Sequence, residues 1–147
     1  MDELEQKAYI FGTVFALSNK LQVLGDAFDE NITIKQWLFC VCVSKFDEPP
    51  TLSEVANFIG YSRQNAKRIA VALNEGGYIT IIKDQDDARA LRISLTPKCT
   101  DYFTKRCHRE LEFLEKVFTG FDADLTHSVY KGLTRLQENI EVMMNND

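Results

Sequence analysis

The sequence predicts a mainly α-helical chain with one small β-hairpin, an α+β fold. Apolar residues recur every three or four positions over most of the chain, which is the spacing of amphipathic helices. Residues that start helices and residues that end them fall between these stretches. One pair of β-branched segments, 78–83 and 90–95, alternates apolar and polar residues on either side of a polar turn. These three observations favour helices throughout, interrupted by a single hairpin.

Two helices are expected in the first third of the chain. Over residues 4–24 the apolar positions indicate one long amphipathic helix, and Gly25 is well placed near its C-terminal end. Asn31 or Thr33 can cap the second helix, because both side chains accept hydrogen bonds from backbone N–H groups. This helix is expected to run to Phe46, where an acidic segment with two prolines stops it.

Two shorter helices are expected next. Thr51 and Glu54 have the spacing of a capping box, and Gly60 closes the helix that they begin. Ser62 caps the following helix, which the glycine pair after Glu75 ends. The link between the two helices is therefore only three residues long. Helix, short link, helix and hairpin, in this order, predict a helix-turn-helix with a wing.

Two long helices are expected at the C-terminal end. Thr96 and Pro97 start one that runs to Gly120, and Asp122 or Asp124 starts the other. The apolar stripes of the long terminal helices exceed what a small winged lobe can bury. We therefore expect a single intertwined domain, with a DNA-binding lobe at 33–96 and dimerisation helices at 1–32 and 97–147. Packing of these helices within one chain is the alternative.

The charge distribution points to one surface for a nucleic-acid partner. The net charge of −5 by itself argues against such a partner, but residues 61–92 carry six cations and four carboxylates, a local charge of +2. No acid occurs from Ser62 to Asn74. Because DNA responds to the field within about 10 Å, the local distribution matters more than the total.

The helix that starts at Ser62 carries side chains suited to a DNA groove. Arg63 can pair with guanine, and Gln64 and Asn65 can pair with adenine. The remaining polar side chains of this helix suit contacts with phosphate oxygens. The threonine that begins the preceding helix belongs to the same predicted surface. These residues are Thr51, Ser62, Lys67 and Arg68. A solvated polar face is the alternative interpretation.

The stretch 51–98 resembles the multiple-antibiotic-resistance regulator (MarR) family of winged-helix repressors. The matching positions are Leu52, Val55, Ala56, Ser62, Leu73, Gly77, Asp84, Asp87, Arg89, Leu95 and Thr96. The resemblance implies a homodimer that binds a palindromic double-stranded DNA operator as a transcriptional regulator, most often a repressor. It further implies release from DNA by a small aromatic or lipophilic effector.

The resemblance also assigns roles in the wing and in an effector pocket. It implies that Arg89 reaches the minor groove and that Asp87 steadies it, with help from Lys83 or Arg92 because the turn supplies no further cation. A purely structural ion pair between Asp87 and Arg89 is the alternative. Aromatic residues expected near the hinge can line the pocket, although aromatics at helical spacing are more often core. They are Tyr9, Phe11, Phe15, Phe28 and Trp37.

Four cysteines raise the question of a metal or redox site. Cys40 and Cys42 would point apart on a helix, and Cys99 and Cys107 would lie roughly 12 Å apart along one, so neither pair suits zinc. We expect free thiols in a reducing compartment and no metal or cofactor. Cys107, which lies among basic residues, is the candidate if the regulator senses oxidants, although the peroxide sensors of the family carry a cysteine early in the first helix.

Other functions and locations are disfavoured. No phosphate loop, nucleophile elbow or HExxH motif occurs, so we expect no enzyme activity. No apolar run approaches the length of a membrane span and no signal peptide is recognisable, so we expect a cytoplasmic protein with no membrane partner. A winged helix that binds other proteins is the remaining alternative.

Overall fold

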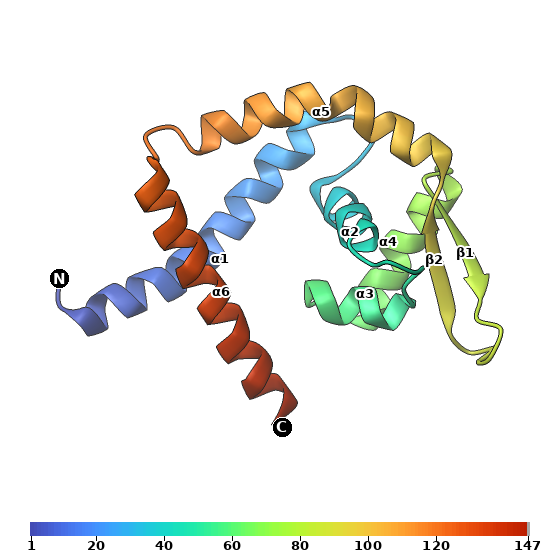
Figure 1. Cartoon of the computed structure of the whole chain (residues 1–147), viewed down its shortest axis with the longest axis horizontal. Helices are drawn as coiled ribbons and strands as arrows, with labels where there is room; N and C mark the ends of the chain where they lie inside the picture. Colours follow the sequence, from blue (N-terminus) through green and yellow to red (C-terminus); the bar gives the residue numbers. More distant parts are fainter. Residues whose placement is uncertain (147) are drawn as a thin grey trace. The chain divides into compact units, whose positions relative to one another are not determined.

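The computed structural model describes residues 1–146. Six helices and one two-stranded antiparallel sheet make up the described chain (Figure 1). In chain order they are α1 (Glu3–Phe28), α2 (Ile34–Ser44), α3 (Leu52–Ile59), α4 (Arg63–Glu75), β1 (Ile79–Lys83), β2 (Leu91–Leu95), α5 (Pro97–Val117) and α6 (Ala123–Asn145). The predicted fold class, helices with one hairpin wing, is confirmed.

The chain forms two compact units, Met1–Phe103 and Thr104–Asp147. The first contains α1 to α4, the hairpin and the start of α5, whereas the second contains the remainder of α5 and α6. Helix α1 belongs to the first unit because it contacts α2.

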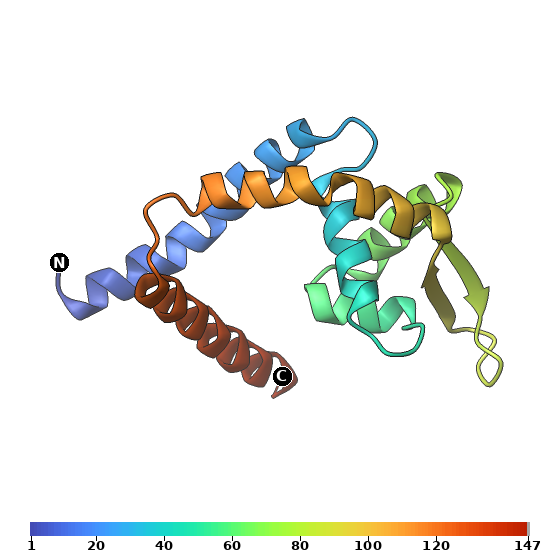
Figure 2. The same cartoon turned by 45° about the horizontal axis from the view of Figure 1, so that its top comes forward.

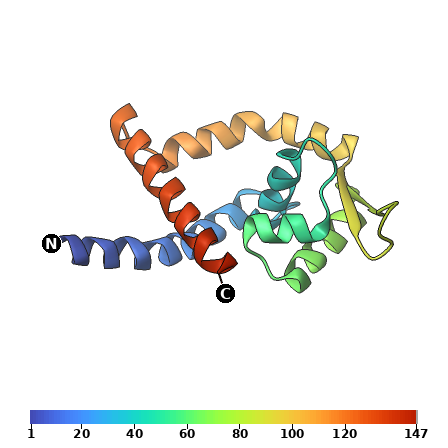
Figure 3. The ribbon, with the colours of Figure 1, turned by 60° about the horizontal axis from the view of Figure 1, so that its bottom comes forward.

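The core of the first unit lies where α2, α3 and α4 meet each other and the hairpin. Figure 3 shows α3 and α4 next to the base of the hairpin. The buried cluster is apolar and takes residues from every one of these elements. It comprises Phe39, Cys40, Cys42, Val43, Leu52, Val55, Ala56, Ala66, Ile69, Ala70, Leu73, Ile79, Ile93 and Cys99.

Side-chain caps fix the starts of the helices. Thr33 accepts from the backbone N–H of Gln36 and caps α2, so of the two candidates Thr33 holds this position. Thr51 and Glu54 form the predicted capping box of α3. Each cap satisfies a backbone donor that has no partner within the helix.

Gly25 has a different role from the one that the sequence indicated. Helix α1 continues past it to Phe28, and Gly25 is buried inside the helix. A Cβ atom built at this position would lie 2.7 Å from the side chain of Ile34. Gly25 therefore marks the close approach of α1 to α2 and does not end the helix.

The hairpin pairs β1 with β2 in a regular register, from Ile79 opposite Leu95 to Lys83 opposite Leu91. Ile79 and Ile93 face the core and are buried. The backbone N–H of Ile93 donates to the carbonyl of Pro50 at 2.9 Å, which joins β2 to the link before α3. Figure 2 shows the turn of the hairpin extending beyond the helices of this unit.

The long terminal helices expose their apolar side chains in the single chain. In α1 these include Leu4, Ile10, Phe11, Val14, Phe15, Leu17, Leu21 and Leu24, and in α6 Leu125, Val129, Leu133, Leu136, Ile140 and Met143. No helix in the described part of the chain combines the length and apolarity that crossing a membrane requires.

Candidate nucleic-acid interface

A tight turn sets α4 against α3. Gly60 ends α3 with φ of +85°, a left-handed conformation that glycine adopts without strain. The N–H groups of Gly60 and Tyr61 both donate to the carbonyl of Ala56. Ser62 then caps α4 by accepting from the N–H of Asn65 at 3.1 Å. The two helices of the predicted motif are thus joined by three residues.

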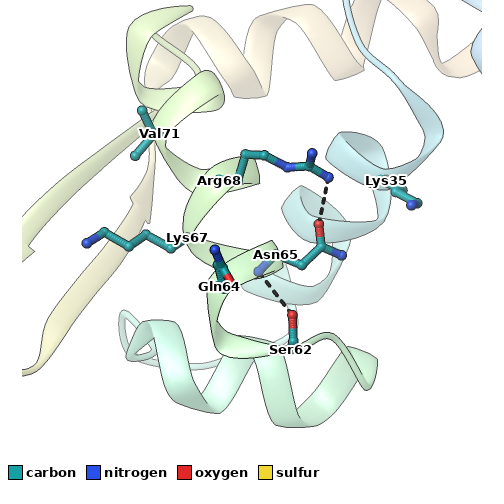
Figure 4. A pocket seen from close by; sticks show the side chains of 7 residues that line it. All are labelled: Lys35, Ser62, Gln64, Asn65, Lys67, Arg68 and Val71. Atoms are coloured by element: carbon teal, nitrogen blue, oxygen red, sulfur yellow. Dashed lines mark hydrogen bonds between the residues drawn. The ribbon is translucent and has the colours of Figure 1, made fainter.

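Helix α4 has one buried face and one exposed face. Ala66, Ile69, Ala70 and Leu73 pack into the core. The opposite face lines an open groove with a volume of about 760 Å³, which Figure 4 shows from close by. The lining residues are Lys35, Ser62, Gln64, Asn65, Lys67, Arg68 and Val71. Five of the predicted DNA-binding residues therefore lie on one surface.

The groove is cationic. Its lining contains Lys35, Lys67 and Arg68 and no carboxylate. Lys35 comes from the first turn of α2 and was not predicted from the sequence. It is almost thirty residues before α4 in the chain, so neither periodicity nor charge runs connect the two. The available signal was its position two residues after the Thr33 cap. A helix N-terminus favours negative charge, so a lysine there points to a role other than stabilising the helix.

Two residues of α4 interact with each other. The side-chain oxygen of Asn65 accepts a hydrogen bond from Nη2 of Arg68 at 3.1 Å. Figure 4 shows both side chains extending from α4 towards the helix that carries Lys35. In this view Lys67 extends to the other side of α4, and the side chain of Gln64 lies in front of the helix. The polar face of α4 is thereby divided between two edges of the helix.

The hydroxyl groups at the two caps can still donate. The oxygens of Thr51 and Ser62 accept from the backbone of Glu54 and Asn65 at 3.1 Å each. A hydroxyl that accepts one hydrogen bond keeps its own proton for a further acceptor, such as a phosphate oxygen. Thr51 and Ser62 each begin a helix of the motif.

The wing places Arg89 in solvent beside Asp87. The side chain of Arg89 is 95% exposed, and its Nε lies 3.7 Å from Oδ1 of Asp87. The same carboxylate oxygen accepts from the backbone N–H of Arg89 at 3.0 Å. The predicted pair is therefore in contact, and the guanidinium remains accessible to a partner. Lys83, at the end of β1, is also exposed.

Arg92 lies differently from the other predicted cations. Its Nε donates to Oδ1 of Asp84 at 3.0 Å, and its Nη1 donates to the carbonyl of Pro49 at 2.9 Å. The hydrogen bond from Arg92 lowers the pKa of the Asp84 carboxyl. The guanidinium of Arg92 is thus bound to groups of the protein itself.

The five aromatic residues suggested for an effector pocket line neither this groove nor a second one. Tyr9, Phe11 and Phe15 are exposed on α1, where Phe11 and Phe15 meet edge to face with ring centroids 5.2 Å apart. Phe28 and Trp37 are half-buried. The second groove, of about 300 Å³, is lined by Gln22, Asp26, Thr33, Lys35, Gln36, Arg68, Ile69 and Ala72.

Three of the four cysteines are buried, and Cys107 is exposed. The thiols of Cys40 and Cys99 interact in the core, a pairing that the sequence spacing did not indicate. This contact and burial raise the pKa of Cys40, and burial raises the pKa of Cys42. Within residues 1–146, no cluster of three histidine, cysteine or acidic side chains is arranged to hold a metal ion.

Comparisons with known proteins identify the fold. No protein-family model and no curated protein sequence matches the chain. Solved structures do match. A MarR transcriptional regulator from Methanosarcina mazei is similar with a TM-score of 0.83 at 19% identity, covering 92% of this chain and 99% of that one.

Two further matches carry ligands in their crystals. FabT from Streptococcus pneumoniae, solved in complex with DNA, has a TM-score of 0.65 at 20% identity. The match covers 93% of this chain and 99% of FabT. The PcaV regulator from Streptomyces coelicolor, solved with its natural ligand, has a TM-score of 0.74 at 15% identity. The match covers 86% of this chain and 89% of PcaV.

The chain is therefore a winged helix-turn-helix protein. Its fold is that of the MarR transcriptional regulators, which confirms at the level of fold the resemblance found in the sequence.

Proposed function

We propose that this protein is a MarR-type transcriptional regulator that binds double-stranded DNA through α4 and the wing. The observation that carries the proposal is the groove along α4, which gathers Lys35, Lys67 and Arg68 without a carboxylate in a chain of net charge −5. Phosphate groups are the partners that such a surface favours. The matching fold of FabT, solved with DNA, supports the same interpretation.

The positions of the side chains suggest distinct roles. Arg63 and Gln64, exposed at the start of α4, contact base edges in the major groove. Lys67 contacts the phosphate backbone on one side of α4, and Arg68 together with Lys35 contacts it on the other. Arg89, extended into solvent from the wing, enters the adjacent minor groove. In this proposal Asn65 orients Arg68 and does not pair with adenine.

The proposal includes a homodimer. The apolar side chains exposed on α1, and separately those exposed on α6, form stripes longer than soluble monomers usually leave in water. A second copy of the chain would cover them. Two-fold symmetry would then place two α4 helices about 34 Å apart, one turn of DNA, on a palindromic operator.

Regulation by an effector belongs to the same proposal. PcaV, which has the same fold, was solved with its natural ligand, and this supports a small molecule that relieves repression. The proposal assigns the chain no catalytic activity.

The test combines binding-site selection with a salt series. Purified protein is incubated with a pool of random-sequence duplexes of about 30 base pairs, long enough for two half-sites one turn apart. Gel shifts at several salt concentrations follow for the selected and unselected pools. We expect a selected palindrome and an affinity that falls steeply with salt, since binding to phosphates releases counterions. A protein that binds no duplex even at low salt would contradict the proposal and favour a protein-binding winged helix.

A further inference from the structure

One side chain links the wing to the helix-turn-helix. Arg92, on β2, donates from Nε to Asp84 at the start of the wing turn, at 3.0 Å. It donates from Nη1 to the carbonyl of Pro49, in the link before α3, at 2.9 Å. The same Nη1 lies 4.0 Å from Oε2 of Glu54 in the first turn of α3. The guanidinium of Arg92 therefore joins the wing to the segment around the start of α3, about forty residues earlier in the chain.

The hydrogen bonds continue from Arg92 to the tip of the wing. Oδ2 of Asp84 accepts from the backbone N–H of Asp87 at 3.2 Å. Oδ1 of Asp87 accepts in turn from the N–H of Arg89 at 3.0 Å and lies 3.7 Å from its Nε. At the other end, Glu54 accepts from the N–H of Thr51 within the capping box of α3. The start of α3 is thus connected step by step to Arg89.

The wing turn needs such a link because apolar packing holds the two strands but not the turn. Ile79 and Ile93 are buried and Leu91 packs against the core, whereas residues 85–89 are polar or small and exposed. A two-stranded hairpin has little stability of its own. The side chains of Arg92 and Asp84 are 34% and 20% exposed, so their charge-assisted hydrogen bond is partly shielded from water. Arg92 also holds the pKa of Asp84 below its ordinary value.

We propose that Arg92 and Asp84 are positioning residues for DNA binding, which hold the wing and Arg89 in a fixed place relative to α3 without contacting DNA themselves. This inference rests on the proposed function, because it concerns how the wing of a DNA-binding protein is oriented. It also explains why a DNA-facing wing keeps acidic residues. Asp84 and Asp87 accept the hydrogen bonds that shape the turn.

The most discriminating test asks whether removing a negative charge from the wing strengthens or weakens binding to DNA. Asp84→Asn removes a negative charge near DNA and keeps the shape of the side chain, so a simple electrostatic effect would strengthen binding. Our proposal requires the opposite, a loss of roughly three- to tenfold in affinity for the selected duplex, because hydrogen bonds to charged groups are stronger than neutral ones. Asp86→Asn is the matched control, because it makes the same charge change in the same exposed turn. The control is expected to bind as well as the wild type or better.

A double-mutant cycle separates positioning from direct contact. If Arg92 acts through Arg89, then Arg92→Gln weakens binding in the wild type but has little further effect in an Arg89→Ala background. If Arg92 contacts phosphate itself, the two losses add, and the inference is overturned. Circular dichroism melts of each variant show whether the lobe is still folded.

Hydrogen exchange tests, in the absence of DNA, whether Arg92 and Asp84 hold the wing in place. Amide protons of residues 84–91 are expected to exchange faster in Asp84→Asn and Arg92→Gln than in the wild type or in Asp86→Asn, while those of α3 and α4 stay protected. Unchanged exchange in the wing overturns the inference whatever the DNA affinity. A wild-type protein that binds no duplex overturns the proposed function instead, so the two failures are distinguishable.

Discussion

Asn65 and Arg68, one turn apart on α4, are joined by a hydrogen bond of 3.1 Å from the guanidinium to the amide oxygen. An asparagine that pairs with adenine uses both its amide oxygen and its amide nitrogen. In our proposal the oxygen of Asn65 stays bonded to Arg68, and this residue orients a phosphate contact.

The first prediction concerns this pair. Asn65→Ala should weaken binding to all duplex sequences by a similar factor, because it releases Arg68 from its place beside Lys35 without removing a base contact. Gln64→Ala is the control and should change the selected sequence. Both variants are measured by binding-site selection and by titration of one selected and one unrelated duplex. A changed base preference in Asn65→Ala would show that Asn65 pairs with a base after all.

Arg63→Ala should relax the base preference at one position of each half-site. Arg63 is the first residue of α4 and is exposed, so its guanidinium is placed to pair with guanine. The expected loss is about 1–3 kcal/mol for the selected duplex and much less for unrelated DNA. Binding-site selection on the variant checks this, and an unaltered consensus would rule out the assignment.

Lys35→Ala should flatten the salt dependence of binding. Each phosphate contact contributes about 0.9 to the slope of log affinity against log salt. A slope that is lower by about this amount, with the sequence preference kept, is the expected result. Lys45→Ala serves as the matched control, because Lys45 carries the same charge but lies at the other end of α2. Equal slopes for both variants would remove Lys35 from the interface.

Gly25→Ala should destabilise the fold by about 1–3 kcal/mol, the usual cost of overpacking. The added Cβ would lie 2.7 Å from the side chain of Ile34, so α1 and α2 must separate. Gly12→Ala in the same helix is the control, since nothing lies within 4 Å of its Cβ position in the chain. Replacing a glycine inside a helix by alanine should there stabilise by about 0.5–1 kcal/mol. Denaturant unfolding of both variants distinguishes the two effects, and equal stabilities would contradict the packing argument.

The thiols offer a fifth test. Cys107 is exposed, whereas Cys40, Cys42 and Cys99 are buried in the first unit. Titration of the native protein with a thiol reagent should therefore give one fast-reacting group, and denaturant should release the remaining three. Cys107→Ser should abolish the fast phase. A fast phase that persists in this variant would mean that the core opens readily.

Local chemistry explains how much of the fold was predictable. The caps at Thr33, Thr51 and Ser62 and the left-handed turn at Gly60 depend on residues within a few positions of each other. A sequence pattern records such relationships directly. The helix-turn-helix, the wing and the polar face of α4 are therefore predictable from the amino-acid sequence alone.

The tertiary structure alone decided which of these side chains interact. Gly25 contacts Ile34, Lys35 joins the groove of α4, and Arg92 binds Pro49, forty-three positions earlier in the chain. Arg92 was expected on DNA because its charge is visible in the sequence, whereas the carbonyl and the carboxylate that hold it are brought near only by folding. Periodicity and capping are encoded over a few residues, but the partner of a charged side chain depends on how distant segments pack.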